Sequence, residues 1–429
     1  MADDTPGPGT YVISKRGPNS RTWQSVTTTT NQAGRIRSFT NSYQEICTGV
    51  AYLDTKTGQY VDSAEQIDLL PDGSASASHG RHKTIFQGNA NTAGGSVTLT
   101  TPDNKTLTSR VYGLCMIDRS TGSNVIVAEL KDSQGTINGN QVVWQDAFTD
   151  FKCDIVDTWT FAGFSQNIVL REAPPDPVAT YGFNLNTTWL EIYTEFINPP
   201  QPQITSQTNQ NIISDNILDF GDMKIGIGSA FSVQGQGSQS GLGVVNKRWC
   251  SIDNRQFLIE SIPFTAITNS ISQLPQHSSS GNPGDKVRHI ASAKPFSPKK
   301  VMGTKHRGTF KRERLASRGS ALDIDYTLLS GETNFLFKSD TTYFVSGLCN
   351  LLGTNTLEGG VVIKYTNNAT AEIQVTNLVC QNAPYRPAIF TSMNDNSIGN
   401  NITGSTGNPW SDNSLGAKMM RDNFNNNGC

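Results

Sequence analysis

The sequence predicts an all-β protein, and three observations lead to that prediction. Apolar and polar residues alternate along 153–161, and a period of two is typical of a half-buried strand. Only 35% of the residues are hydrophobic, and the 39 glycines favour many turns, a composition that suits polar sheets better than helices. No stretch of ordinary helix length has apolar residues spaced by three and four. We therefore expect two β-sandwich-like domains of mainly antiparallel strands, with extended N- and C-terminal arms.

The clearest single feature is a hairpin with arms at 153–161 and 164–170. Ala162 and Gly163 interrupt the alternation between the arms, as a turn does. We expect the two arms to pair antiparallel, with Trp159 buried in a core.

Further short apolar runs, separated by Gly, Asn and Asp turns, predict the other strands in order. In the first part of the chain we expect strands at 10–14, 21–30, 49–53, 59–62, 82–86, 96–101, 107–117 and 124–130. In the second part we expect strands at 187–197, 217–220, 223–227, 244–249, 256–262, 322–328, 334–338, 341–346, 360–365 and 371–379. The Gly-, Ser- and Gln-rich stretch 234–243 reads as a flexible loop.

Prolines suggest where one domain ends. Pro174, Pro175 and Pro177 follow the predicted hairpin, and proline cannot donate to a β ladder. From residue 393 onward the chain is dominated by Asn, Gly and Ser, which suggests that the second core closes near residue 390. We therefore expect an N-terminal arm with the first strands at 1–30, a first domain at 31–175, a second domain at 176–390 with a basic loop at 286–318, and a polar C-terminal arm at 391–429.

Charge restricts the classes of partner. The net charge is −2, so the molecule as a whole is not attracted to nucleic acid or to an anionic membrane. No apolar run is long enough to cross a bilayer, and the first residues lack the basic and apolar regions of a secretory signal. We expect neither a membrane span nor nucleic-acid binding.

The most unusual local feature is the basic segment 286–318. It holds eleven Lys and Arg residues against Glu313 as its one acidic residue, a local charge of +10, which leaves −12 on the rest of the chain. Such a segment could bind nucleic acid or an anionic polymer. It has few aromatic residues to stack on bases, however, and no recognised nucleic-acid motif. A neutralising contact with acidic surface of the same or a neighbouring subunit explains this split with fewer assumptions. The partner-binding residues that we expect are Lys299, Lys300, Lys311 and Arg312.

One predicted strand carries aromatic and carboxylate side chains on a single face. Trp189, Glu191, Tyr193 and Glu195 alternate there, a combination that suits glycan binding. Glu191 and Glu195 lie four residues apart, roughly 13 Å along a strand. A glycosidase pair needs about 5 to 9.5 Å, so we do not expect catalysis from them. A solvated strand face is the simpler interpretation of these carboxylates.

Other candidate sites are weaker. Asn394, Asp395 and Asn396 offer closely spaced oxygens that calcium accepts, but they complete no calcium-binding loop, and turn formation explains them equally well. His79 and His82 are two potential metal ligands without a suggested third, so we interpret them as ordinary loop and strand residues. Calcium is thus the single cofactor candidate.

Nucleotide and hydrolase signatures are missing from the sequence. It contains no C-x-x-C, no G-x-x-x-x-G-K-[ST] and no G-x-S-x-G, and 226–231 lacks the third glycine of a dinucleotide-binding loop. We therefore expect no catalytic residues and lean away from an enzyme.

Several segments resemble one protein class. The residues concerned are Asp146, Trp159, Gly163 and 168–170, together with the segments 82–86, 194–196 and 383–388. They are similar to an uncharacterised β-rich segment of large bacterial surface and wall-associated proteins, and that segment often precedes Rhs-type repeats. This resemblance implies a surface location and carries no catalytic residues.

Two functional hypotheses follow. The first is a structural or interaction protein, a subunit of an extracellular or cell-surface assembly or fibre, in which homo-oligomers or polymers form through β-strand and charge-complementary contacts. Its terminal arm would complete a neighbour's sheet with the Thr-rich run 25–30. The alternative is a carbohydrate-binding or carbohydrate-active surface protein with a polysaccharide partner.

Overall fold

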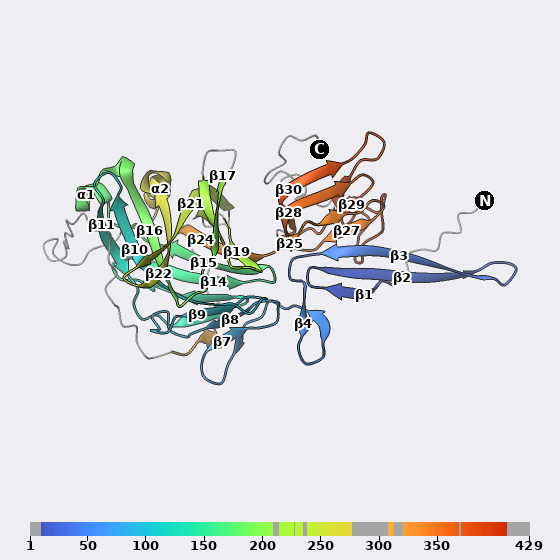
Figure 1. Ribbon diagram of the computed structural model, residues 1–429, viewed down its shortest axis with the longest axis horizontal. Coiled ribbons are helices and arrows are strands. Elements are labelled where there is room, and N and C mark those ends of the chain that lie inside the picture. Colours follow the sequence, from blue (N-terminus) through green and yellow to red (C-terminus); the bar gives the residue numbers. More distant parts are fainter. Residues whose placement is uncertain are drawn as a thin grey trace. The chain divides into compact units, whose positions relative to one another are not determined.

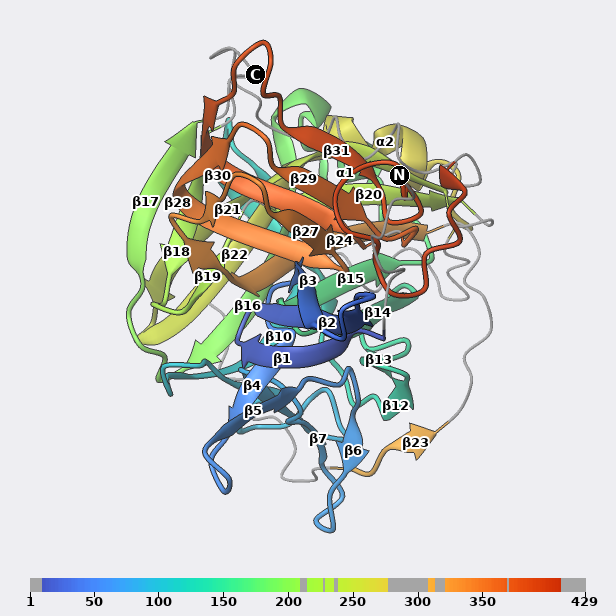
Figure 2. The same ribbon diagram turned by 90° about the vertical axis from the view of Figure 1, so that its right-hand side faces the viewer.

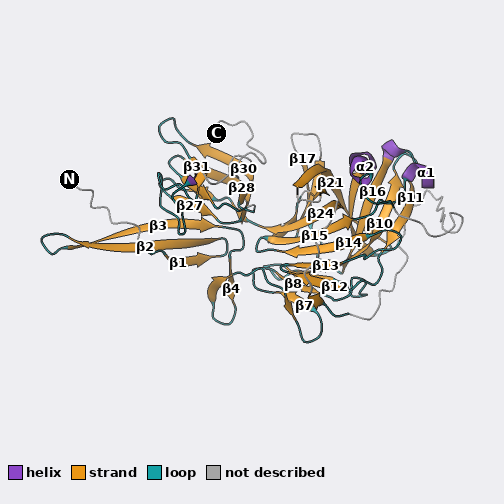
Figure 3. Cartoon of the chain, turned by 180° about the vertical axis from the view of Figure 1, so that it is seen from behind, coloured by secondary structure: helices purple, strands orange, loops and turns teal. Residues whose placement is uncertain are grey.

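Strands dominate the structure, and the all-β prediction is confirmed (Figures 1 and 3). The computed structural model describes residues 10–208, 214–226, 228–234, 238–276, 308–312, 321–368 and 370–409. The chain forms two compact units. Unit 1 consists of Met1–Ala64 and Ser330–Cys429, and unit 2 consists of Glu65–Leu329.

Unit 1 is made of two larger sheets and a small hairpin, β4–β5. Its strands are β1 (Val12–Gly17), β2 (Ser20–Thr30), β3 (Ile36–Ile46), β4 (Ala51–Asp54), β5 (Gln59–Asp62), β25 (Glu332–Thr333), β26 (Leu336–Phe337), β27 (Thr342–Val345), β28 (Leu348–Glu358), β29 (Val362–Tyr365), β30 (Glu372–Gln381) and β31 (Ile389–Ser392). The six-stranded sheet has the order β1-β2-β3-β27-β29-β31. In the other sheet, β28 pairs with β25 and β26 along one edge and with β30 along the other.

The C-terminal half of unit 1 is a parallel stack. From β26 to β31 the chain passes from one sheet to the other at each connection, and β27, β29 and β31 run parallel, side by side (Figure 2). Tyr343, Leu357 and Ile363 belong to the core between the sheets. The sequence did not predict parallel pairing, because short apolar runs carry no signal for strand direction.

Unit 2 is a closed sheet of mostly antiparallel strands around a large apolar core. Its strands are β6 (Asp68–Leu69), β7 (Ala75–Ala77), β8 (Lys83–Phe86), β9 (Val97–Thr100), β10 (Thr106–Asp118), β11 (Ser123–Glu129), β12 (Gly135–Asn138), β13 (Gln141–Trp144), β14 (Cys153–Trp159), β15 (Gly163–Leu170), β16 (Thr188–Ile197), β17 (Gln203–Thr208), β18 (Ser214–Asp219), β19 (Met223–Ile225), β20 (Gly228–Gln234), β21 (Ser238–Ile252), β22 (Arg255–Pro263), β23 (Lys311–Arg312) and β24 (Ala321–Ser330). Its helical elements are short, namely α1 (Pro177–Tyr181), the 3-10 turn η1 (Leu185–Thr187) and α2 (Phe264–Ile271).

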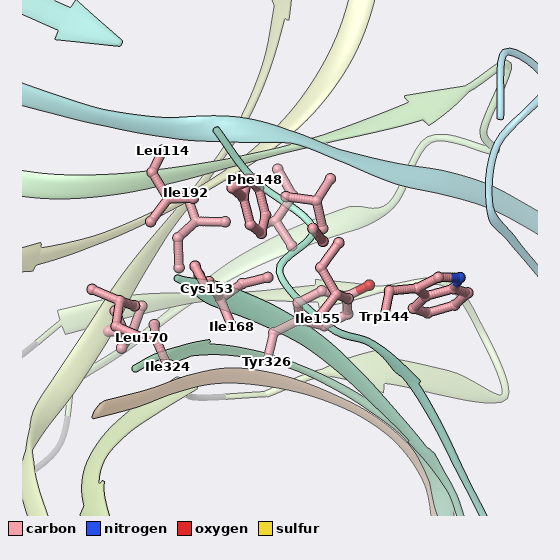
Figure 4. Packing of buried hydrophobic residues seen from close by; sticks show 14 of the residues in the cluster. Leu114, Trp144, Phe148, Cys153, Ile155, Ile168, Leu170, Ile192, Ile324 and Tyr326 are labelled. Atoms are coloured by element: carbon pink, nitrogen blue, oxygen red, sulfur yellow. The ribbon is translucent and has the colours of Figure 1, made fainter. Parts of the chain in front are cut away.

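The predicted hairpin forms as expected. Cys153 pairs with Leu170 and Trp159 with Phe164, so β14 and β15 are antiparallel throughout. Trp159 is fully buried. Figure 4 shows the core around this hairpin, with Ile155 of β14 among its labelled side chains.

The two units do not divide the chain at the predicted boundaries near 175 and 390. Pro177 begins α1 inside unit 2, and the Asp176 side chain accepts hydrogen bonds from the backbone of its first turn. The strands before and after these prolines contribute Ile168 and Ile192 to the same core. The prolines therefore end a strand without ending a domain.

Several other segments differ from expectation. Ser238 begins β21, so part of the predicted 234–243 loop is strand. The strands that were not predicted are β3, β6, β7, β12, β13, β17, β20, β23, β25, β28 and β31. β3 gave no signal because its distal half is exposed on both faces. Within the predicted C-terminal arm, residues as far as 409 are described and pack onto unit 1, where Ile402 is buried and Thr403 accepts a 3.0 Å hydrogen bond from Tyr43. Residues 410–429 and 1–9 of the predicted arms lie outside the described residues.

In the described part of the chain, no helix is both long and apolar enough to span a membrane.

We expect Trp159→Ala to lower the free energy of unfolding by about 3 to 5 kcal/mol, because it empties a fully buried site. Urea unfolding followed by circular dichroism measures this loss. Tyr385→Ala is the aromatic control, since Tyr385 is completely exposed, and it should change stability by less than about 0.5 kcal/mol. Equal effects of the two substitutions would contradict the assignment of Trp159 to the core.

Candidate functional site

The most exposed regular structure in unit 1 is the distal part of the β2–β3 hairpin, residues 26–40, which we call the ribbon. β2 pairs with β3 from Ser20 opposite Ile46 to Thr30 opposite Ile36. The ribbon extends well past the end of β1 (Figure 1). The Asn31 side chain accepts hydrogen bonds of 3.0 and 2.9 Å from the backbone of Ala33 and Arg35 in the turn at the tip of the ribbon.

Both edges of the ribbon are open in the described part of the chain. β1 follows β2 only as far as Gln24, and β27 pairs with β3 only at 44–46. The backbone groups that point away from the partner strand along 26–30 and 36–41 therefore face no further strand among the described residues. Nearer the base, Ser25 is 1% exposed and the Ser42 carbonyl accepts a 2.9 Å hydrogen bond from Asn400. An open edge of this kind is a template for pairing with another strand.

The ribbon also exposes apolar side chains. Val26 is 61% exposed, Ile36 71% and Phe39 39%. A two-stranded hairpin is marginally stable in water by itself, because it buries little apolar surface. Covering these side chains would stabilise the ribbon.

The predicted glycan residues do lie on one face of β16, as expected from the alternation. Leu190, Ile192 and Phe196 point into the large core, whereas Tyr193 joins a second cluster on the opposite face. That face is not solvated, however. Glu191 is 2% exposed and Glu195 7%, which corrects the prediction of an exposed strand face.

Glu195 is the centre of a buried charge cluster. Arg255 contacts both of its carboxylate oxygens at 2.7 Å, and Arg110 contacts Oε2 at 3.0 Å. β10 and β22 flank β16 and supply the two arginines. Burial acts to raise the pKa of Glu195, but the hydrogen bonds and charges of Arg255 and Arg110 outweigh it and hold that pKa below its ordinary value.

Glu191 belongs to a separate group on the same face. It accepts a 2.9 Å hydrogen bond from the Tyr193 hydroxyl and lies 3.7 Å from Arg119. The Arg119 guanidinium lies 3.5 Å from the centre of the Trp189 ring, a cation–π contact. Burial, together with Cys115 and Glu191, raises the pKa of the Tyr193 hydroxyl.

These contacts leave the candidate glycan face without an open binding surface. Both carboxylates are held by arginine, and Tyr193 is buried with Glu191 and Glu195. The arrangement stabilises the sheet electrostatically and presents no pair of free carboxyl groups for catalysis.

Part of the basic segment is anchored to unit 2. Lys311 and Arg312 form β23, which runs parallel to β12. Gln134 donates a 2.7 Å hydrogen bond to the backbone of Thr309 beside it. Lys311 is exposed, as a partner contact requires. The predicted contact residues Lys299 and Lys300 lie outside the described residues.

The predicted calcium residues form a turn whose oxygens already accept protein hydrogen bonds. Ser397 and Thr391 donate to the Asp395 carboxylate, and Thr406 N donates to Asn394 at 2.8 Å. The Asn396 side-chain oxygen accepts a 2.8 Å bond from Ser405. The described residues hold no metal-binding group of three or more His, Cys, Asp and Glu side chains. Calcium binding here stays a prediction.

The two histidines are separated by the fold. His79 lies 2.9 Å from Asp68 at the surface, whereas His82 is fully buried with its ring centre 5.0 Å from that of Trp159. Burial lowers the pKa of His82 to about 4. His82 is thus a neutral core residue at neutral pH.

Charged residues inside unit 2 were missed by the sequence analysis. Lys247 lies between the core residues Val245 and Trp249, and Glu260 lies between Leu258 and Ile262. Asp157 holds the same kind of position on β14 and is fully buried, and burial raises its pKa. These residues could have been recognised in the sequence, because each is a charged residue at an inward position of an alternating strand.

Neither a scan of protein-family models nor a search of curated proteins finds a match to the chain. The resemblance to bacterial wall-associated proteins therefore stays a prediction.

We expect Glu195→Gln to lower the free energy of unfolding by about 3 kcal/mol, because it leaves Arg110 and Arg255 close together without their shared carboxylate. Chemical denaturation at neutral pH measures the loss. Glu372→Gln is the control, since Glu372 lies at the partly exposed start of β30 and should have little effect. A stable Glu195→Gln protein would show that the cluster does not support the sheet.

We expect His82 to make the protein sensitive to mild acid. Its pKa is about 4 in the folded state and 6.5 in the unfolded state, so the unfolded state binds the proton more readily. The stability that depends on neutral His82 is complete above pH 6.5 and is lost as the pH falls toward 4, by about 3 kcal/mol at most.

The measurement compares urea unfolding of the wild type with that of His82→Leu at several values between pH 7 and pH 4.5. The free-energy difference between the two proteins should shift in favour of the variant as the pH falls. A difference that is constant across this range would contradict the assignment.

Proposed function

We propose that the protein is a structural subunit that associates with further copies of itself through the ribbon. The observation that carries the proposal is a projecting two-stranded sheet with both edges open among the described residues and apolar side chains exposed. Strand addition at such an edge gives affinity through backbone hydrogen bonds and register through alternate side chains.

The β2 edge fits a second copy of the chain. Its open stretch 26–30 is uncharged and rich in threonine, a β-branched residue with high strand propensity. Two such edges can pair antiparallel across a two-fold axis without bringing like charges together. The β3 edge carries Arg37, and Arg35 lies in the turn, so self-pairing there would oppose like charges.

Charge complementarity adds a second contact. The basic segment 286–318 carries +10 against −12 on the remainder, and its Lys311 is exposed beside β12. A contact between this segment and acidic surface of another copy would strengthen association at low ionic strength and weaken as salt screens it.

Such an assembly suits an extracellular or cell-surface role. The polar sheets, the exposed ribbon and the split of charge support a subunit of a surface layer or fibre more than an enzyme. The burial of Glu191, Tyr193 and Glu195 gives no support to a polysaccharide partner at that face.

We expect Thr28→Lys to weaken self-association roughly tenfold or more, because it places two like charges close together across the proposed two-fold contact. Sedimentation velocity over a concentration series measures the dissociation constant. The measurement is made at low and high salt to separate ribbon pairing from the charge contact.

Ser38→Lys is the matched control, since Ser38 pairs with Thr28 on the other strand of the ribbon. It adds the same charge one strand away from the proposed contact, so its effect should be much smaller. A wild-type protein that stays monomeric at high concentration would refute the proposal. Equal effects of the two substitutions would refute the choice of the β2 edge.

A further inference from the structure

A lysine and an aspartate meet inside unit 2, whereas the ribbon belongs to unit 1. Lys247 Nζ on β21 is in direct contact with Asp215 Oδ2 on β18. The lysine side chain is 0% exposed and the aspartate side chain 1%. No feature of the proposed self-association uses this pair.

The pair lies against the apolar core of unit 2. Val245 and Trp249 flank Lys247 along β21 and belong to or pack on the apolar core. An ion pair in such a place has lost the hydration of both charges.

The other oxygen of Asp215 is held by the backbone. Oδ1 accepts hydrogen bonds of 2.8 Å from both Lys247 N and Asn216 N. Two backbone N–H groups aimed at one carboxyl oxygen polarise the carbon and stabilise negative charge that develops on that oxygen. Lys247 Nζ therefore approaches a carboxyl group whose geometry suits nucleophilic attack.

A second carboxyl group lies beside the pair. Glu260 of β22 is directly opposite Lys247 in the β21–β22 ladder, where side chains on the same face are neighbours. It is 2% exposed and lies between two residues of the same core, Leu258 and Ile262. Its carboxylate is placed to take a proton from Nζ and return it to a leaving oxygen.

We propose that Lys247 and Asp215 become joined by an amide bond in the folded protein. In this reaction a proton first passes from Nζ to Oδ2, Nζ then attacks Cγ of Asp215, and Oδ1 carries the negative charge of the tetrahedral intermediate. The Glu260 carboxylate accepts a proton from Nζ and passes it to Oδ2. The Cγ–Oδ2 bond breaks, one water molecule leaves, and an amide remains. No atom is oxidised or reduced, so no further reactant is needed.

Two other lysines of the chain show what is particular to this pair. Lys224 lies 2.7 Å from Asp219, but both side chains are partly exposed, so water stabilises the ion pair. Lys364 is buried, but its ammonium donates to the backbone carbonyls of Asp395 and Asn400, which are not electrophiles of this kind. Lys247 combines burial, a carboxyl partner and a neighbouring third group.

Intact-mass spectrometry of the denatured full-length protein tests the proposal. The wild type should be one water molecule lighter than its sequence requires. Peptide mapping should find a branched peptide that joins the segments containing residues 215 and 247. A wild-type mass equal to that of the sequence, after the folded protein has been kept at neutral pH, would overturn the proposal. So would a water loss that maps to a succinimide at another aspartate.

Substitutions test the roles of Lys247 and Asp215 in the proposed reaction. Lys247→Arg keeps the charge and removes the nucleophile, and Asp215→Ala removes the carbon that is attacked, so both should have the full sequence mass. Lys224→Arg is the matched control and should keep the water loss. Persistence of the water loss in Lys247→Arg would refute the assignment. If these variants do not fold, the wild-type mass and peptide map still decide.

Glu260→Gln tests the proton transfer. This variant keeps the shape of the side chain and should fold, but the fraction of cross-linked protein should rise much more slowly with time than in the wild type. The mass spectrum reports that fraction directly, so a loss of stability alone cannot imitate the effect. Cross-linking at the wild-type rate would remove Glu260 from the reaction.

Discussion

The hydrogen bonding of backbone groups at strand edges is the constraint on which this structure depends. A strand in the middle of a sheet has its backbone groups satisfied on both sides, and an edge strand has half of them open. In unit 2, pairing continues from strand to strand until the sheet closes, so β10, β16 and β22 each have neighbours on two sides. The ribbon in unit 1 takes the opposite arrangement, with two strands that extend beyond their neighbours. This contrast within one chain is the reason why association is assigned to the ribbon.

Closure of the sheet also decides what happens to charged residues. Strands in unit 2 are covered on both faces over much of their length, so a charge on either face loses water and requires a partner. Glu195 finds two arginines on neighbouring strands, and Lys247 finds Asp215. We propose a reaction only for the second pair, because arginine is a poor nucleophile and an uncharged lysine is a good one.

The sequence allowed prediction of features that depend on local alternation. The β14–β15 hairpin and the burial of Trp159 follow from period-two patterns over a few residues, and the shared face of Glu191 and Glu195 follows from the same rule. Their burial could not be predicted, because it depends on Arg110, Tyr112 and Arg255, which are far away in the chain. The pairing of Lys247 with Asp215 was hidden for the same reason, and no local pattern connects β18 with β21. The exposed half of β3 has no buried face and hence no alternation to detect.

Unit 1 is assembled from the two ends of the described chain, and this arrangement sets an order of events. Its sheet is continuous only when β3 meets β27, at Gln44 opposite Tyr343, and all of unit 2 lies between them in the sequence. During synthesis the N-terminal strands emerge first and must wait for their partners. The base of the ribbon is therefore fixed only when the parallel stack has been made. A subunit built in this way would complete the surface that we propose for association late, which would keep nascent chains from joining one another on the ribosome.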